Sequence, residues 1–210
     1  METRFGRAAR LLKFEGPEMQ VVVGSLLGDG TLLETTSGFC FRVHHGLKQK
    51  YLADWKYGIL RRFVRTLPRA SGSGYYFRTV THPVITALRL EFYEGNRKVV
   101  PFHCLERHLG GLALATWIMD DGAADGAQLR INTQGFTFEE NQRLISLLKR
   151  KFGLSMTVNF DKGRPRLRCR ASSMEKLVQI VGPYIHPEMC YKLASHLTTR
   201  ACGTAPFAGN

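Results

Sequence analysis

The stretch Val22-Val23-Gly24-Ser25-Leu26-Leu27-Gly28-Asp29-Gly30 decides the fold, because a similar one follows 92 positions later as Leu114-Ala115-Thr116-Trp117-Ile118-Met119-Asp120-Asp121-Gly122. Each copy is a run of apolar and small residues that closes on Asp-Gly. Apolar residues on nearly all sides of a helix predict that the helix is buried, and a closing glycine is a common stop signal. We therefore expect two buried helices, each with a carboxylate at its end.

The first copy favours close packing of the two helices. Gly24 and Gly28 are four residues apart, on one helix face, where a second backbone can approach closely. If the copies pack along this face, Asp29 and Asp121 come together. Neighbouring carboxylates raise each other's pKa unless a cation lies between them, and oxygen ligands suit a divalent ion. A helix C-cap carboxylate is the plain alternative, but it would oppose the helix dipole. The pair therefore indicates a metal site.

The two copies resemble the motif of the LAGLIDADG homing endonucleases in their single-chain, two-motif form. The first copy matches well, whereas Thr116 and Asp120 replace the small residues of the second, so that we expect less symmetric or slightly wider helix packing there. The likeness extends to residues 131–140 and 187–193 and covers most of the chain. It implies an α/β (α+β) fold with two pseudosymmetric αββαββα repeats, packed through the motif helices, and a saddle of two antiparallel DNA-binding sheets.

Periodicity along the chain agrees with such a repeat. We predict strands at 31–36, 39–44, 75–81, 128–134, 154–160 and 164–171, and helices at 50–67, 83–93, 137–152, 172–181 and 187–197. Thr137 and Glu140 form the sequence signature of a capping box. A loop at 68–74, a connection at 95–109 and a polar turn around Asp125 complete the pattern. We place the first repeat with its linker at 1–109, the second at 110–200 and a disordered tail at 201–210.

The charge of the chain favours nucleic acid as a partner. Thirty lysines and arginines against 17 aspartates and glutamates give a formal net charge of +13. Residues 1–109 carry 17 basic and 9 acidic side chains, and residues 110–210 carry 13 and 8, so both halves are basic. Solubility alone is the simpler explanation, but a positive charge on both halves suits one shared polyanion.

Other features of the composition limit the cellular compartments in which we expect the protein. Five cysteines without paired spacing indicate neither a disulfide framework nor a zinc ribbon. No apolar run reaches the roughly 18 residues of a membrane span, and no signal peptide precedes the first motif. We expect a bacterial cytoplasm or an organelle, no membrane contact and no secretion. Arg4, Arg7 and Arg10 imitate a targeting leader, but Glu2 and the lack of serines favour a frayed basic arm at 1–13.

One predicted strand presents a row of arginines. Arg164, Arg166, Arg168 and Arg170 occupy every second position, so that four guanidinium groups share one face. Arginine pairs with guanine, and asparagine or glutamine pairs with adenine, in the DNA major groove. An edge strand protected by charge against aggregation is the alternative. We predict a DNA-binding surface that adds to this row Arg42, His44, Tyr76, Arg78, Gln128, Arg130, Asn132, Thr157 and Asn159.

The expected chemistry is phosphodiester hydrolysis, which needs an activated water and stabilisation of negative charge. Asp29 and Asp121, with Mg²⁺ shared between them, would supply the metal part. Mn²⁺ or Ca²⁺ can occupy such a site, and we expect Ca²⁺ to be non-catalytic. The resemblance adds the backbone carbonyl groups of Gly28 and Asp120 as further metal ligands.

Basic and polar residues complete the predicted site. Lys98 and Lys192 sit at equivalent places in the two repeats and resemble the active-site lysines of the family. An ordinary surface charge is the alternative for each lysine, but the matched positions favour a catalytic role. Gln134, or His44 or His45 in the first repeat, could order the water network.

We therefore expect a monomeric homing endonuclease that makes a metal-dependent, staggered double-strand break in a long DNA target and promotes the mobility of its host intron. The alternative is an RNA maturase that binds its host intron RNA with the same fold and does not cleave DNA. A DNA-binding regulator without catalysis is a third possibility. The intact acidic pair favours the nuclease over both.

Overall fold

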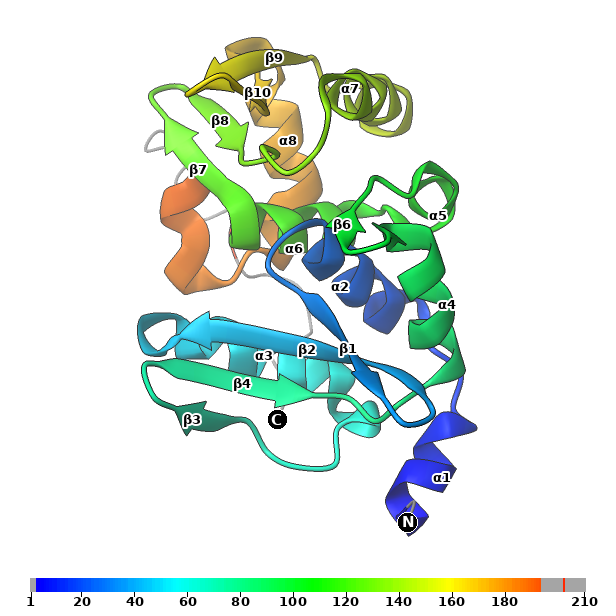
Figure 1. Cartoon of the computed structure of the whole chain (residues 1–210). Helices are drawn as coiled ribbons and strands as arrows, with labels where there is room; N and C mark the ends of the chain where they lie inside the picture. Colours follow the sequence, from blue (N-terminus) through cyan, green and yellow to red (C-terminus); the bar gives the residue numbers. More distant parts are fainter. Residues whose placement is uncertain (1–2, 194–201, 203–210) are drawn as a thin grey trace.

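Two apolar helices occupy the centre of the computed structural model, which describes residues 3–193 and 202. Helices α2 (Gly16–Leu27) and α6 (Gly111–Asp121) pack side by side between two β-sheets (Figure 1). A capping box formed by Glu15 and Glu18 starts α2. Residues 21–27 of α2 and 112–119 of α6 are all buried, which confirms the two buried motif helices.

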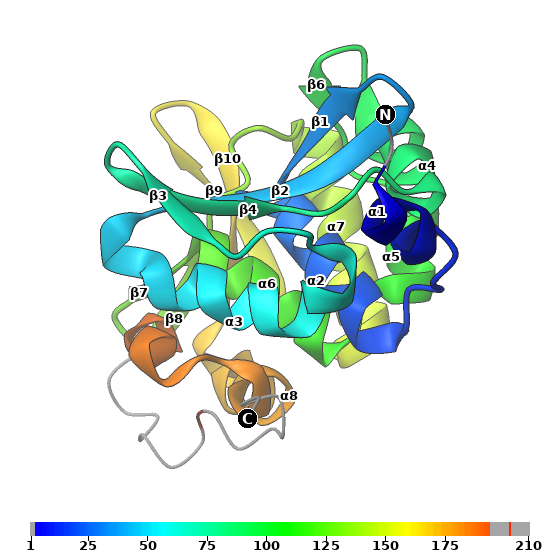
Figure 2. The same ribbon diagram turned by 90° about the horizontal axis from the view of Figure 1, so that it is seen from below.

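The first repeat builds a four-stranded antiparallel sheet in the order β1-β2-β4-β3. Its elements are β1 (Thr31–Thr35), β2 (Gly38–Gly46), α3 (Lys50–Leu60), β3 (Arg69–Ser71), β4 (Gly74–Arg78) and α4 (Pro83–Phe92). Helix α3 packs against β2 and β4, as Figure 2 shows from below. The inward side chains of the sheet, such as Phe41, Val43 and Phe77, are buried, and the alternate residues form the other face.

The second repeat has the same order of elements and builds the sheet β7-β8-β10-β9. It contains β7 (Gly122–Asp125), β8 (Gln128–Ile131), α7 (Phe138–Phe152), β9 (Met156–Asp161), β10 (Arg164–Cys169) and α8 (Met174–Val181). The predicted capping box of Thr137 and Glu140 starts α7, and Gly153 ends it in the left-handed conformation with φ 66°. Both repeats therefore follow the predicted αββαββα order.

Short elements lie outside this pattern. They are α1 (Arg4–Arg10), β5 (Tyr93–Glu94), β6 (Arg97–Lys98), α5 (Phe102–His108) and five 3₁₀ helices, at Leu47–Gln49, Arg61–Phe63, Ala171–Ser173, Gly182–Tyr184 and Pro187–Leu193. A helix therefore replaces the frayed arm expected before the first motif. Strand β6 and helix α5 lie within the connection predicted at 95–109.

Four strands were missed, and several elements are shorter than predicted. Two of the four, β5 and β6, pair with each other at the end of the helix predicted at 83–93 and in the connection that follows it. Strand β3 lies within the expected loop at 68–74, and β7 covers Gly122–Asp125 and so includes the residue around which a polar turn was expected. Both are short and lack an alternating apolar pattern, so they depend on pairing with β4 and β8. Helix α3 ends at Leu60 rather than at residue 67. Residues 194–197 of the last predicted helix lie outside the described residues, as does the tail at 201–210 except for Cys202.

One hydrophobic core runs through both repeats and includes Leu26, Phe77, Trp117 and Leu148. The repeats thus share their interior, and the boundary after residue 109 stays a prediction.

Cys190 and Cys202 form a disulfide, which the cysteine spacing did not indicate. Cys40, Cys104 and Cys169 are free and buried. Within the described part of the chain, no helix has the length and apolar character needed to span a membrane.

Candidate active site and nucleic-acid surface

The glycines of the first motif make room for the larger residues of the second. A Cβ built on Gly24 would lie 2.8 Å from the Cβ of Thr116, and one built on Gly28 would lie 2.6 Å from the Cβ of Asp120. Real side-chain carbons do not approach this closely. The two motifs are therefore complementary rather than identical: the first has no side chain at these two positions, and the second fills the space with the side chains of Thr116 and Asp120.

The C-terminal ends of the motif helices bring three carboxylates together. Asp29 follows α2, and Asp120 and Asp121 end α6. Burial, followed by the charges of Asp29 and Asp120, raises the pKa of Asp121 to about 7. Burial and the charge of Asp120 also raise the pKa of Asp29. The charge of Asp29 therefore acts on Asp121 at the seam of the two repeats.

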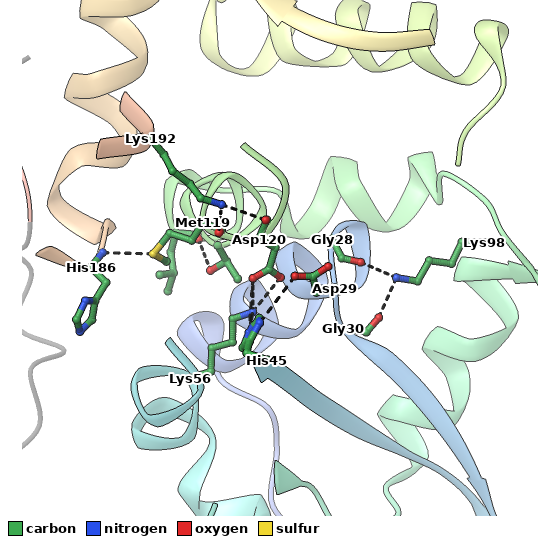
Figure 3. Close-up of polar contacts among 12 residues, drawn as sticks. Gly28, Asp29, Gly30, His45, Lys56, Lys98, Met119, Asp120, His186 and Lys192 are labelled. Atoms are coloured by element: carbon green, nitrogen blue, oxygen red, sulfur yellow. Dashed lines mark hydrogen bonds and ion pairs between the residues drawn. The ribbon is translucent and has the colours of Figure 1, made fainter. Parts of the chain in front are cut away.

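Asp120 has a partner that the sequence did not predict. Its carboxylate accepts hydrogen bonds from the Nζ of Lys56 at 2.6 and 2.8 Å, and both side chains are buried (Figure 3). The backbone N–H of Asp29 also donates to the Asp120 carboxylate. Asp120 therefore lies at the centre of the seam through its side chain as well as its backbone.

His45 completes this buried group. Its Nε2 lies 3.3 Å from the Nζ of Lys56, and its Nδ1 lies 3.8 Å from a carboxylate oxygen of Asp29. Burial, followed by the charge of Lys56, lowers the pKa of His45 to about 3, so that the ring is neutral near pH 7. We call Lys56, Asp120 and His45 the buried cluster.

The sequence carries a signal for the burial of Lys56. Lys56 falls midway between Leu52 and Leu60 on α3, four residues from each, and all three are fully buried. A lysine within an apolar helical stripe is rarely buried without a partner. Only the folded chain identifies that partner as Asp120, 64 positions away.

The two predicted lysines lie at matching places on the motif ends. The Nζ of Lys98 donates to the carbonyl oxygens of Gly28 and Gly30, at 2.7 and 2.8 Å. The Nζ of Lys192 donates to the carbonyl oxygens of Met119 and Asp120, at 2.5 and 3.1 Å. Lys98 comes from β6 and Lys192 from the last 3₁₀ helix, on opposite sides of the site (Figure 3). Burial lowers the pKa of both ammonium groups, against the opposing effect of the aspartates.

The remaining predicted water-ordering residues lie around this centre. Gln134 is half-buried in the turn after β8. His44 is exposed near the end of β2 and faces away from the core. A hollow of about 280 Å³ joins Asp29 to Arg42, His44 and His45. The acidic centre of the first repeat thus opens onto the polar face of its own sheet.

In the first sheet, the predicted DNA-binding residues share one face. Arg42 pairs with Arg78 and His44 pairs with Tyr76 in the register of β2 and β4. The guanidinium of Arg42 lies 5.1 Å from the ring centroid of Tyr76, an ordinary cation–π distance. This face therefore presents cationic and aromatic groups beside the acidic centre.

In the second sheet, the predicted residues form cross-strand pairs. Arg168 lies opposite both Arg130 and Thr157, and Arg166 lies opposite Asn159. Arg164 is exposed at the start of β10, and Gln128 starts β8 opposite Asp125. Arg170 and Asn132 are exposed but lie just beyond the ends of β10 and β8. The arginine row on the strand is therefore three residues long rather than four, because β10 ends at Cys169.

The arginines of this sheet are incompletely satisfied. Arg166 lies 3.3 Å from Asp161 and Arg168 lies 3.1 Å from Asp125, so part of their charge is paired within the sheet. The Nε atoms of Arg42, Arg166 and Arg168 and the Oδ1 of Asn159 are buried without a hydrogen-bond partner. Buried polar groups normally have partners, so unsatisfied groups on both sheets suit a polar ligand that covers them.

The residues at the seam fit a divalent cation. Asp29, His45 and Asp120 offer ligand atoms that all lie within 4.8 Å of one another, among the residues that the structure describes. Both Asp120 oxygens already bind Lys56 and the Nε2 of His45 faces the same ammonium, so these two side chains are poor ligands. The pKa values of all three aspartates are raised, but only Asp29 and Asp121 have no lysine bound to both carboxylate oxygens, so they are the oxygen donors left for a cation, although Asp121 lies outside the group of three.

Comparison with known proteins agrees with this architecture. Residues 19–177 match the model of the LAGLIDADG DNA endonuclease family, and the chain belongs to this family. It is 38% identical over 121 residues to the intron-encoded endonuclease ai4 of Dictyostelium discoideum, a match that covers 57% of this chain and 76% of the relative. It is 28% identical over 200 residues to the cytochrome b mRNA maturase bI2 of Debaryomyces hansenii, which covers 85% and 74% of the two chains.

A solved structure shows the same fold over nearly the whole chain. The homing endonuclease I-WcaI, solved bound to its DNA recognition sequence, superposes with a TM-score of 0.80 and 23% sequence identity, over 91% of this chain and 93% of that one. The predicted α+β fold with two antiparallel sheets is thereby confirmed.

Proposed function

We propose that this protein is an intron-encoded homing endonuclease that acts as a monomer and makes a Mg²⁺-dependent, staggered double-strand break in a long DNA target. The observation that carries the proposal is the seam itself. The charge of Asp29 acts on Asp121 there, at the ends of two packed helices. The half-buried Lys98 binds one motif end, the buried Lys192 binds the other, and a basic sheet flanks each side. Both halves of the site come from one chain, so no second copy is needed.

Asp29 and Asp121 would hold Mg²⁺. The carbonyl oxygens of Gly28 and Asp120 accept hydrogen bonds from Lys98 and Lys192, so each would join the metal ligands only by giving up its lysine. Bound there, the ion would stabilise negative charge on the phosphate and make the attacking water more acidic. Lys98 and Lys192 each place an ammonium group at one motif end, where it can neutralise charge on a phosphate oxygen. Gln134 in the second repeat would orient water. Two related centres at one seam suit the cutting of two strands.

The two sheets would bind the DNA. Arg42, His44, Tyr76 and Arg78 on the first sheet and the arginine row with its neighbours on the second are the groups that would contact bases and phosphates. Two similar sheets from two similar repeats suit a long and nearly palindromic target. The Nε atoms of three arginines and the Oδ1 of Asn159 on these sheets, which have no hydrogen-bond partner, support this role.

A plasmid assay tests the proposal. A supercoiled plasmid carrying the intronless form of the host locus should be linearised when Mg²⁺ is added and stay intact in EDTA. Asp29→Asn and Asp121→Asn should each still bind the plasmid but lose the cutting of one strand, so that nicked circles accumulate. Glu139→Gln, an exposed acidic residue on α7, is the matched control and should cut as wild type does. Undiminished linearisation by both aspartate variants would remove the mechanism.

The maturase is the second candidate, and the likeness to the maturase bI2 favours it. In that case the same basic faces would bind the host intron RNA and assist its splicing. A filter-binding assay with intron RNA separates the two functions when it is combined with the plasmid assay. Tight and specific RNA binding without DNA cleavage at any Mg²⁺ concentration would assign the maturase instead.

A further inference from the structure

The buried cluster lies on one side of the seam only. Lys56 comes from α3, His45 from β2 and Asp120 from α6, so three elements that are far apart in the sequence meet beside Asp29 (Figure 3). Lys56 is fully buried, and the His45 and Asp120 side chains are 2% and 0% exposed. Removing two charges from water costs free energy, which the attraction between them often does not recover. The buried Lys56–Asp120 pair is therefore weak evidence for a purely stabilising role and leaves room for a functional one.

The hydrogen bonds of Lys56 determine the tautomer of His45. An ammonium group has three protons to donate and accepts nothing. The three acceptors of Lys56 are the two Asp120 oxygens, at 2.6 and 2.8 Å, and the Nε2 of His45, at 3.3 Å. Nε2 must therefore carry a lone pair, and the proton of the neutral ring lies on Nδ1. That atom is the one that faces Asp29, 3.8 Å from its carboxylate oxygen.

Asp29 is held from its other side as well. Its backbone N–H donates to the Asp120 carboxylate, which Lys56 holds in place. The Asp29 side chain itself is 49% exposed, so its carboxylate can rotate toward the Nδ1–H of His45. One ammonium group thus connects to both the backbone and the side chain of the same aspartate.

The second repeat has a different arrangement at the corresponding place. Thr31 pairs with Arg42 as Ala123 pairs with Arg130, so the strand register makes Thr133 the counterpart of His45. The Thr133 hydroxyl hydrogen-bonds to Asn141 of α7, at 2.5 Å, instead of facing Asp121. Gly28 is the counterpart of Asp120 and has no side chain to bind a lysine.

We propose that His45 is a positioning residue for Asp29, and that Lys56 and Asp120 hold His45 in the tautomer that directs Nδ1–H at this carboxylate. The inference rests on the proposed nuclease function. It implies that the two strands differ in their dependence on the buried cluster. Cleavage of the strand that depends on Asp29 needs the cluster, and cleavage of the strand that depends on Asp121 does not.

Strand-resolved nicking tests the proposal. The products of Asp29→Asn and Asp121→Asn first define which strand depends on which aspartate. His45→Phe keeps a ring but no donor, and should slow the Asp29-dependent strand by roughly 10- to 100-fold, as loss of a partner that orients a metal ligand usually does. The other strand should be cut at the wild-type rate, and thermal unfolding should show that the variant is folded.

Two further variants separate positioning from packing. An asparagine amide can place its N–H where Nδ1 lies, whereas a glutamine amide reaches the place of Nε2. His45→Asn should therefore restore much of the lost rate, and His45→Gln should not. Equal slowing of both strands by His45→Phe, or better rescue by glutamine than by asparagine, would overturn the proposal.

A measurement without DNA tests the tautomer directly. In metal-free protein with ¹⁵N-labelled histidine, long-range NMR correlations should show His45 as the Nδ1–H tautomer. Lys56→Met with Asp120→Asn removes both buried charges together, so no lone charge is left inside, and His45 should then lose this preference. An Nε2–H ring in the wild type would refute the proposal. If the wild type cuts no plasmid, the proposed nuclease function is wrong. The tautomer of His45 is measured without DNA, so that result is independent of the cleavage assay.

Discussion

Replacing Gly24 by alanine tests the close approach of the two motif helices. The added Cβ would lie 2.8 Å from the Cβ of Thr116, and closer still to the carbonyl oxygen of Ala113 on α6. Carbon atoms in contact prefer about 3.5–4.0 Å, so α2 and α6 would have to separate by roughly 0.7 Å or more. Part of the obstacle is backbone, and no side-chain rotation can relieve it.

The expected loss of stability follows from two opposing effects. Overpacking costs about 1–3 kcal/mol, and a rigid carbonyl places Gly24 at the upper end of that range. The better helix propensity of alanine returns about 0.5–1 kcal/mol. The free energy of unfolding should therefore fall by about 2 kcal/mol. For a chain of this size, that corresponds to a Tm lower by roughly 4–8 °C.

Urea unfolding followed by circular dichroism measures this loss. Gly58→Ala is the matched control, because Gly58 is an exposed residue of α3 and a Cβ there would meet nothing within 4 Å. That control should leave stability unchanged or raise it by up to about 1 kcal/mol. If Gly24→Ala unfolds at the same urea concentration as the wild type or higher, the reasoning about the helix contact is refuted.

Three further predictions concern the site. First, the pKa of Asp121 rises from 3.8 to about 7 on folding, so the metal-free folded state binds the extra proton between these values and its stability should fall as pH rises from 4 to 7. Asp121→Asn should flatten that slope in urea titrations made in EDTA, and an unchanged slope would contradict the assigned shift. Second, Lys98→Met should slow cleavage by roughly 10- to 100-fold with little loss of DNA binding, because its ammonium binds the carbonyl groups beside Asp29; wild-type single-turnover rates would exclude a catalytic role. Third, Arg168→Ala should weaken specific DNA binding by about 1–3 kcal/mol in a titration at fixed salt. Arg150→Ala on α7 serves as its control, and equal losses in both variants would indicate only a general charge effect.

Much of the framework was predictable from the sequence, because its signals are local. Two apolar stretches that both end in Asp-Gly predicted the motif helices, and apolar periodicity predicted most of the strands and long helices. Their common order in the two halves predicted the repeat. Strands β3, β5, β6 and β7 and helices α1 and α5 were missed, since short elements carry too few residues for a periodic pattern and form through contacts with their neighbours.

The candidate site divides in the same way. The sequence by itself determined that Asp29 and Asp121 close the motif helices, and that Lys98 and Lys192 occupy matching places in the repeats. It also determined that arginines alternate along one strand. Only the tertiary structure decided that Asp120 turns its carboxylate to Lys56, and that His45 of β2 stands between this pair and Asp29. The physical reason is that a helix or strand pattern depends on residues near in the chain. A buried ion pair depends instead on which helix faces which across the core, and that is settled only when α2, α3 and α6 pack together.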